Sequence, residues 1–166
     1  MSVKDNVDMK EEYMVEFLLH HTYTHFSGIL GVVIGVGALA MGITTMVNGN
    51  AQTSWPMFLI AFLFLIATPR TTIKKAKQQV NNSEMFKNTL EYEFAETGVT
   101  VRQGEANATN EWKDFMKAIE TKKSVILYVT RLRAIIFPKA CMGDQYAEVV
   151  KMIRTHMPAA KVKIRG

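Results

Sequence analysis

Two long apolar runs in the first half of the chain separate its pattern from that of an ordinary water-soluble protein. The run at 26–47 (FSGILGVVIGVGALAMGITTMV) has 22 residues and no charged side chain. As a helix it would be about 33 Å long, enough to cross the roughly 30 Å hydrocarbon core of a bilayer. The second run, 55–68, has only 14 residues, but the uncharged residues 51–54 extend it to 18. We therefore predict a transmembrane hairpin at 26–69, with helices at about 26–47 and 52–69.

Two other interpretations of these runs stay open from the sequence. Ala38-Leu39-Ala40 resembles the small-residue cleavage site of a signal peptide, although the acidic segment before the first run is unlike a basic leader. The second run could also be a buried helix of a water-soluble domain, because it is shorter than a usual membrane span.

Small residues recur at spacings of three and four along the first run. Such a stripe lets another helix backbone approach closely, and it includes one GxxxG pattern. The partner could be the second helix of the same hairpin, rich in Phe and Leu, or it could be a second copy or another membrane protein. The predicted helix-packing residues are Gly28, Gly31, Gly35, Ala38 and Gly42.

Charge is distributed unevenly and predicts the orientation of the hairpin. Residues 1–69 carry a net charge of −3, whereas residues 70–166 carry +8. Arg70, Lys74, Lys75 and Lys77 follow the second run directly, and positive residues flank spans on the cytoplasmic side. We expect a multi-pass protein of the plasma (inner) membrane with both termini cytoplasmic. Residues 1–25 then form a cytoplasmic or interfacial segment, and 70–86 a basic linker that continues the helix to about Asn81-Asn82.

From residue 87 onward, the hydrophobic pattern changes to that of an α+β domain. Leu90, Tyr92 and Phe94 alternate with glutamates as in a half-buried strand. Further short strands follow, ending with VILYV at 125–129 and AIIF at 134–137. The segment 146–157 then has one apolar face at helical spacing and stops before Pro158. The predicted fold at 87–166 is a small antiparallel barrel of the pleckstrin-homology-like type, capped by a C-terminal helix.

Several segments of this domain together resemble a known family. They are LEYEF (90–94), Gly98-Val99, EWKDF (111–115), IET (119–121), VILY (125–128) and AIIFPK (134–139). In this order they resemble the YcxB-like proteins, which are bacterial membrane proteins with a transmembrane hairpin and a pleckstrin-homology-like domain. The arginine that usually follows Pro-Lys in that family is replaced here by Ala140. The resemblance implies no established activity.

The chain offers little catalytic chemistry. Its one cysteine, Cys141, excludes an intramolecular disulfide, and we find neither a nucleophile–base pattern nor a glycine-rich phosphate loop outside the apolar run. His21 and His25 have a spacing that can hold a metal ion on a helix, but no third ligand accompanies them. We predict no catalytic residue, no metal site, no cofactor and no binding to nucleic acid.

Basic residues at two consecutive turns are the better candidates for a site. Lys122 and Lys123 occupy one predicted turn, and Arg131 and Arg133 the next. On one rim of a barrel they could bind anionic headgroups or a protein partner, or could simply be solvated. We therefore expect a non-enzymatic, membrane-anchored adaptor that contacts membrane lipids or an unknown protein. The alternative is an immunity-type protein that protects a bacterial membrane against a cognate toxin.

Overall fold

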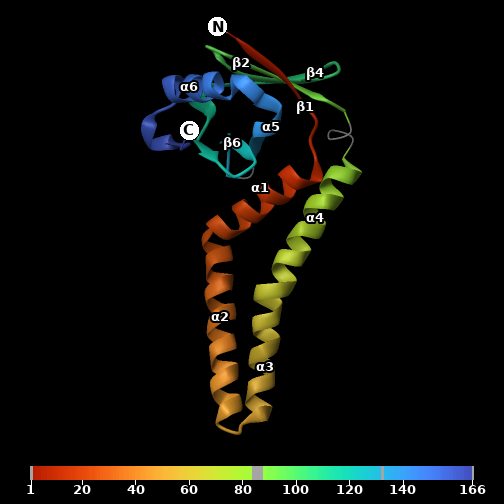
Figure 1. Cartoon of the computed structure of the whole chain (residues 1–166), viewed down its shortest axis with the longest axis vertical. Helices are drawn as coiled ribbons and strands as arrows, with labels where there is room; N and C mark the ends of the chain where they lie inside the picture. The colour runs from red at the N-terminus through yellow and green to blue at the C-terminus, as the bar shows by residue number, and fades with distance from the viewer. Residues whose placement is uncertain (1, 84–87, 132, 166) are drawn as a thin grey trace. The chain divides into compact units, whose positions relative to one another are not determined.

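A computed structural model describes residues 2–83, 88–131 and 133–165. Residues 84–86 of the predicted basic linker lie outside this range, as do residues 87, 132 and 166 of the predicted domain. The described chain forms two compact units (Figure 1). The helical unit covers 17–79, and the α+β unit combines residues up to Glu16 with those from Val80 onward.

The helical unit contains two helices that are long and apolar enough to cross a membrane. Helix α2 (Phe26–Val47) has the predicted bounds. The second helix spans Ala51–Asn82 and consists of α3 (Ala51–Phe62), η1 (Leu63–Ala67) and α4 (Thr68–Asn82). It is longer than the predicted 52–69 because the basic segment after it stays helical, ending at Asn82 as expected. Figure 1 shows α2 and α3 side by side.

The segment η1 is a turn of π-helix inside this second helix, and Pro69 gives a physical reason for it. Proline has no N–H, so residue 69 cannot continue the α-helical ladder, and its ring crowds the preceding turn. The wider turn relieves the crowding. There the N–H of Thr68 donates to the carbonyl of Leu63, and the Thr68 hydroxyl lies 2.9 Å from the same oxygen.

The first sheet of the α+β unit takes one strand from the N-terminal segment. Its antiparallel order is β1 (Val3–Val7), β2 (Leu90–Ala95), β3 (Gly98–Gln103) and β4 (Ala106–Glu111). Val3 pairs with Phe94 and Val7 with Leu90. The sequence did not predict β1, because two valines around three polar residues give too short a pattern. Helix α1 (Glu11–Thr24) follows β1, and its first two turns belong to the same unit.

The second sheet has the order β7-β6-β5-β8, with bounds β5 (Lys117–Glu120), β6 (Ser124–Tyr128), β7 (Ala134–Pro138) and β8 (Val162–Lys163). Strand β8 runs parallel to β5, and the other pairs are antiparallel. The described strands therefore form two four-stranded sheets, which confirms the predicted α+β class, and they do not close into a barrel. After β4 the chain leaves the ladder through the 3-10 turn η3 (Trp112–Asp114), so no described ladder joins the sheets.

One hydrophobic core joins these two sheets with the C-terminal helix. The short helical segments after β7 are α5 (Lys139–Met142), η4 (Gly143–Gln145), α6 (Tyr146–His156) and η5 (Ala159–Lys161). Phe94, Phe115 and Phe137 are fully buried in this core, each contributing about 1.5–3 kcal/mol of apolar transfer free energy. Helix α6 adds the face predicted for it, with Val149, Val150 and Ile153 buried, and Met157, which follows the helix, is buried as well.

Candidate binding surfaces of the α+β unit

The four basic residues predicted to share a rim lie at opposite ends of strand β6. Lys122 and Lys123 precede β6, whereas Arg131 and Arg133 follow it. The five residues of β6 extend over about 13 Å, and the two turns lie beyond its opposite ends. Successive turns of an antiparallel meander alternate between its ends, so the structure does not bring the two pairs together.

At the first turn, Lys123 is bound by two glutamates of α1. Its Nζ donates to Oε2 of Glu12 at 2.5 Å, and its N–H donates to the carboxylate of Glu16 at 3.1 and 3.3 Å. The Thr121 hydroxyl lies 2.9 Å from Oε2 of Glu16. The hydrogen bond with Glu12 raises the pKa of Lys123, and the same bond lowers the pKa of Glu12. This turn is therefore already occupied by carboxylates of the same chain.

At the second turn, the arginines have no such partners. Arg131 and Arg133 are exposed, and neither forms an ion pair within the described part of the chain. The backbone is nonetheless ordered by hydrogen bonds: the N–H groups of Val129 and Thr130 donate to the carbonyl of Arg133 at 3.0 and 3.1 Å. The two guanidinium groups are free to meet an external anion.

Two further side chains at this end extend the surface. Lys117 opens β5 opposite Tyr128, and its Nζ lies 4.4 Å from the centre of that ring. Met116 precedes it and is 49% exposed, the one exposed large apolar side chain among the described residues of the α+β unit. We name the set Met116, Lys117, Arg131 and Arg133 the basic edge. The sequence missed Met116 and Lys117 because only the strand register places them beside the second turn.

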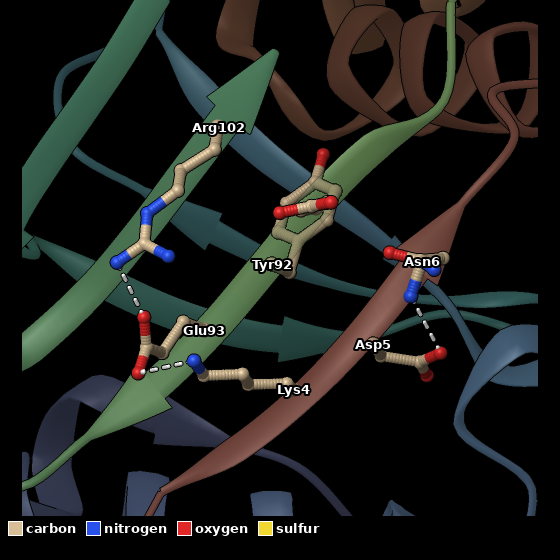
Figure 2. A pocket seen from close by; sticks show the side chains of 7 residues that line it. Lys4, Asp5, Asn6, Tyr92, Glu93 and Arg102 are labelled. Carbon is tan, nitrogen blue, oxygen red and sulfur yellow. Dashed lines mark hydrogen bonds and ion pairs between the residues drawn. The ribbon is translucent and has the colours of Figure 1, made fainter. Parts of the chain in front are cut away.

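A separate polar hollow of about 360 Å³ lies on the first sheet (Figure 2). Glu93 of β2 accepts from Arg102 of β3 at 2.7 Å and pairs with Lys4 of β1 at 3.5 Å. Figure 2 shows the Glu93 carboxylate between the two cations, so both already have an acidic partner. Asp5 also lines the hollow, and burial raises the pKa of its carboxyl group. The hollow offers less to an anionic ligand than the basic edge does.

A third polar cluster surrounds Glu120 at the end of β5. Its carboxylate accepts from Nζ of Lys139, from the Tyr146 hydroxyl at 2.8 Å and from the N–H of Arg165 at 2.7 Å. The Lys139 hydrogen bond is the main reason why the pKa of Glu120 falls to about 2. Burial, followed by the bond with Glu120, raises the pKa of Tyr146 to about 12. The cluster joins β5, α5, α6 and the C-terminal segment, which is a structural role.

In the helical unit, four of the five predicted packing residues face the second helix. Gly31, Gly35, Ala38 and Gly42 are the buried positions of α2. A Cβ atom on the glycines would meet Phe64, Leu65 and Phe58. Gly28 differs, because its Cβ would lie 1.8 Å from the carbonyl oxygen of Thr22, at the bend between α1 and α2. The small-residue face is thus covered by the chain's own second helix.

The remaining candidate residues do not assemble into a reactive centre. The rings of His21 and His25 lie 4.2 Å apart. Within the described ranges, no group of three or more His, Cys, Asp or Glu side chains could hold a metal ion. Cys141 is half-buried, and burial raises the pKa of its thiol.

The chain therefore combines an α+β unit with two apolar helices that are long enough to cross a membrane. The family model described as YcxB-like protein matches residues 94–153, from the end of β2 into α6. This match confirms the resemblance read from the sequence, and the chain carries a YcxB-like domain over these residues. Comparison with curated proteins and with solved structures gave no match.

Proposed function

We propose that this chain is a non-enzymatic, membrane-anchored binding protein whose α+β unit contacts anionic lipid headgroups through the basic edge. The observation that carries the proposal is an exposed methionine beside three cations that have no carboxylate partner among the described residues. Each basic residue near an anionic surface contributes about 1 kcal/mol of attraction. Insertion of Met116 into the headgroup region would add apolar burial.

The helices and the first sheet support the membrane part of the proposal. Helix α2 and the second helix are each long and apolar enough to cross a membrane, which we propose is the bacterial inner membrane, and Arg70, Lys74, Lys75 and Lys77 follow the apolar part of the second. Pairing of β1 with β2 requires both ends of the hairpin to lie on one side of the bilayer. The basic residues favour the cytoplasmic side, so both termini would be cytoplasmic.

The order of elements supports a pleckstrin-homology-like fold for the α+β unit. A four-stranded antiparallel sheet is followed by the antiparallel meander β5-β6-β7 and then by α6, whose apolar face enters the shared core. The predicted helix-capped barrel has the same order of elements, and in this structure its strands form two sheets. A fold of this kind suits a binding role, because its turns present side chains without requiring a deep pocket.

The test uses the full chain in nanodiscs of neutral phosphatidylcholine, immobilised on a biosensor surface. Vesicles containing phosphatidylglycerol are then passed over it. We expect capture by the wild type and at least a tenfold weaker apparent affinity for K117A/R131A/R133A, because three contributions of about 1 kcal/mol are removed. M116S should also weaken capture at constant charge.

The matched control neutralises three exposed lysines elsewhere, as K10A/K151A/K163A. It should retain most of the capture. An equal loss in the control, or equal capture of phosphatidylcholine vesicles, would contradict lipid binding at the basic edge. In that case a protein partner at the same surface becomes the better explanation.

A further inference from the structure

The turn between β5 and β6 has the donor set of an anion-binding site. A backbone N–H from Lys123 and the hydroxyl of Thr121 both meet the carboxylate of Glu16. The ammonium group of Lys123 meets the carboxylate of Glu12. Lys122 is exposed beside them. A hydroxyl, a backbone N–H and an ammonium group converging on oxyanions are the groups that bind phosphate in proteins.

The two glutamates reach this turn from a distant part of the sequence. They lie on α1, more than 100 residues before the donors that they meet. Each carboxylate fills the position that one anionic oxygen pair of a phosphate group would take. From this geometry we propose that the β5–β6 turn is a phosphate-binding site held closed by Glu12 and Glu16.

Opening this site requires only a local rearrangement. The side chains of Glu12 and Lys123 are 46% and 50% exposed, so water and salt screen their attraction. Exposed side chains change rotamer within nanoseconds. Tyr13 and Met14 are buried in the same helical turns, and their packing keeps α1 in place while the glutamates rotate away. The site therefore exchanges one anion for another without unfolding.

The ligand is a group bearing a phosphate monoester or diester. A lipid headgroup and a soluble phosphate compound share this chemistry. The site is separate from the basic edge, since the two lie at opposite ends of β6. Because Glu12 and Glu16 bind Lys123, the exposed pair Lys122-Lys123 does not by itself form an open binding surface.

The experiment compares the full chain with E12Q/E16Q in phosphatidylcholine nanodiscs. Inorganic phosphate and glycerol 3-phosphate are titrated while the amide signal of ¹⁵N-labelled Lys123 is followed by NMR. Removing the competing carboxylates should tighten binding by about tenfold, the factor expected for one charged hydrogen bond. T121V/K123A, added to the same variant, should abolish the gain when binding is measured calorimetrically.

The control E105Q/E148Q makes the same change in net charge at exposed positions elsewhere. It should bind phosphate no better than the wild type. A parallel titration with phosphatidylglycerol vesicles distinguishes the sources: a gain with vesicles alone identifies a lipid headgroup, and a gain with soluble phosphates identifies a free ligand.

The proposal is overturned if E12Q/E16Q binds neither probe more tightly than the wild type, or if E105Q/E148Q gains as much. Should the double variant unfold, E12Q alone keeps the bonds of Glu16 and tests the same point with an expected gain of about threefold. The tighter binding caused by E12Q/E16Q should also be seen when K117A/R131A/R133A is present. A failure of the basic edge can therefore be distinguished from a failure of this site.

Discussion

Single carboxylates determine much of the behaviour of the α+β unit. Glu120 accepts three hydrogen bonds from different elements, and its side chain is only 16% exposed. A carboxylate in this position is stabilised in its charged form. The hydrogen bonds that Glu120 accepts therefore stabilise the fold fully only while Glu120 is ionised.

This gives a pH dependence with a definite sign. The folded pKa of Glu120, about 2, is below its usual value of 4.5, so its contribution is fully present above pH 4.5 and is lost as the pH falls toward 2. We expect E120Q to lower the stability at pH 7 by about 2 kcal/mol but to matter much less at pH 2.5. Thermal unfolding of the detergent-solubilised chain measures both. E105Q is the control, and an equal effect at the two pH values would refute the assignment.

The candidate site was only partly predictable at this scale. Lys122, Lys123, Arg131 and Arg133 stood out because basic residues in turns are visible in a sequence. That Lys123 is held by Glu12 was not visible, because 111 positions separate the two. Nor could the sequence show which basic residues pair with carboxylates and which do not. That difference depends on which strand ends lie next to α1.

At the scale of elements, the clearest case is the contact of α2 with α3 and η1. A Cβ atom on Gly35 would lie 2.8 Å from both Cγ and Cδ2 of Leu65, whereas nothing lies within 4 Å of one on Gly37. Two glycines two residues apart on one helix therefore have opposite roles. The first lets the helices touch, and the second faces outward.

The two positions form a matched pair of substitutions. We expect G35V to destabilise the hairpin by about 1–3 kcal/mol, because its side chain overpacks the interface. G37V should be close to neutral. Resistance of the chain to SDS-induced unfolding, followed by circular dichroism, measures the difference. Similar losses for both would mean that intrinsic helix propensity, and not packing, governs these sites.

Element prediction succeeded where the pattern was long and local. The bounds of α2, the end of α4 at Asn82, and β2, β6, β7 and α6 follow from runs of side chains with a steady period. It failed for β1 and β8, of five and two residues, whose identity as strands comes from partners far away in the sequence. The division of the strands into two sheets was not predicted for a related reason, because periodicity indicates strands but not where a ladder ends.

For the whole molecule, the α+β unit is interrupted by the hairpin between its first two strands. A fragment of residues 80–166 lacks β1, so it exposes the edge of β2 and loses Val3 and Val7 from the core. We expect this fragment to aggregate or to unfold at low denaturant. Joining residues 2–16 to 80–166 through about eight Gly/Ser residues should give a folded monomer, since Glu11 and Asn81 are already hydrogen-bonded at 2.9 Å.

Size-exclusion chromatography and urea unfolding compare the two proteins. Val7→Asp in the joined protein is the control for β1, because Val7 is fully buried and opposite Leu90. It should return the joined protein to the behaviour of the fragment. A fragment as stable as the joined protein would show that β1 contributes little.

The pairing of β1 with β2 also orders events during synthesis. Strand β1 leaves the ribosome first, but its partner is made only after about 80 more residues, including both apolar helices. On the proposed topology, with both apolar helices spanning the bilayer, the first sheet can close only after the second helix has brought the chain back to the side on which β1 lies. A nascent chain with one helix misplaced would leave β1 and β2 apart, each with an unpaired edge open to aggregation or proteolysis. On that proposal, completion of this sheet would occur only in chains whose hairpin has been inserted correctly.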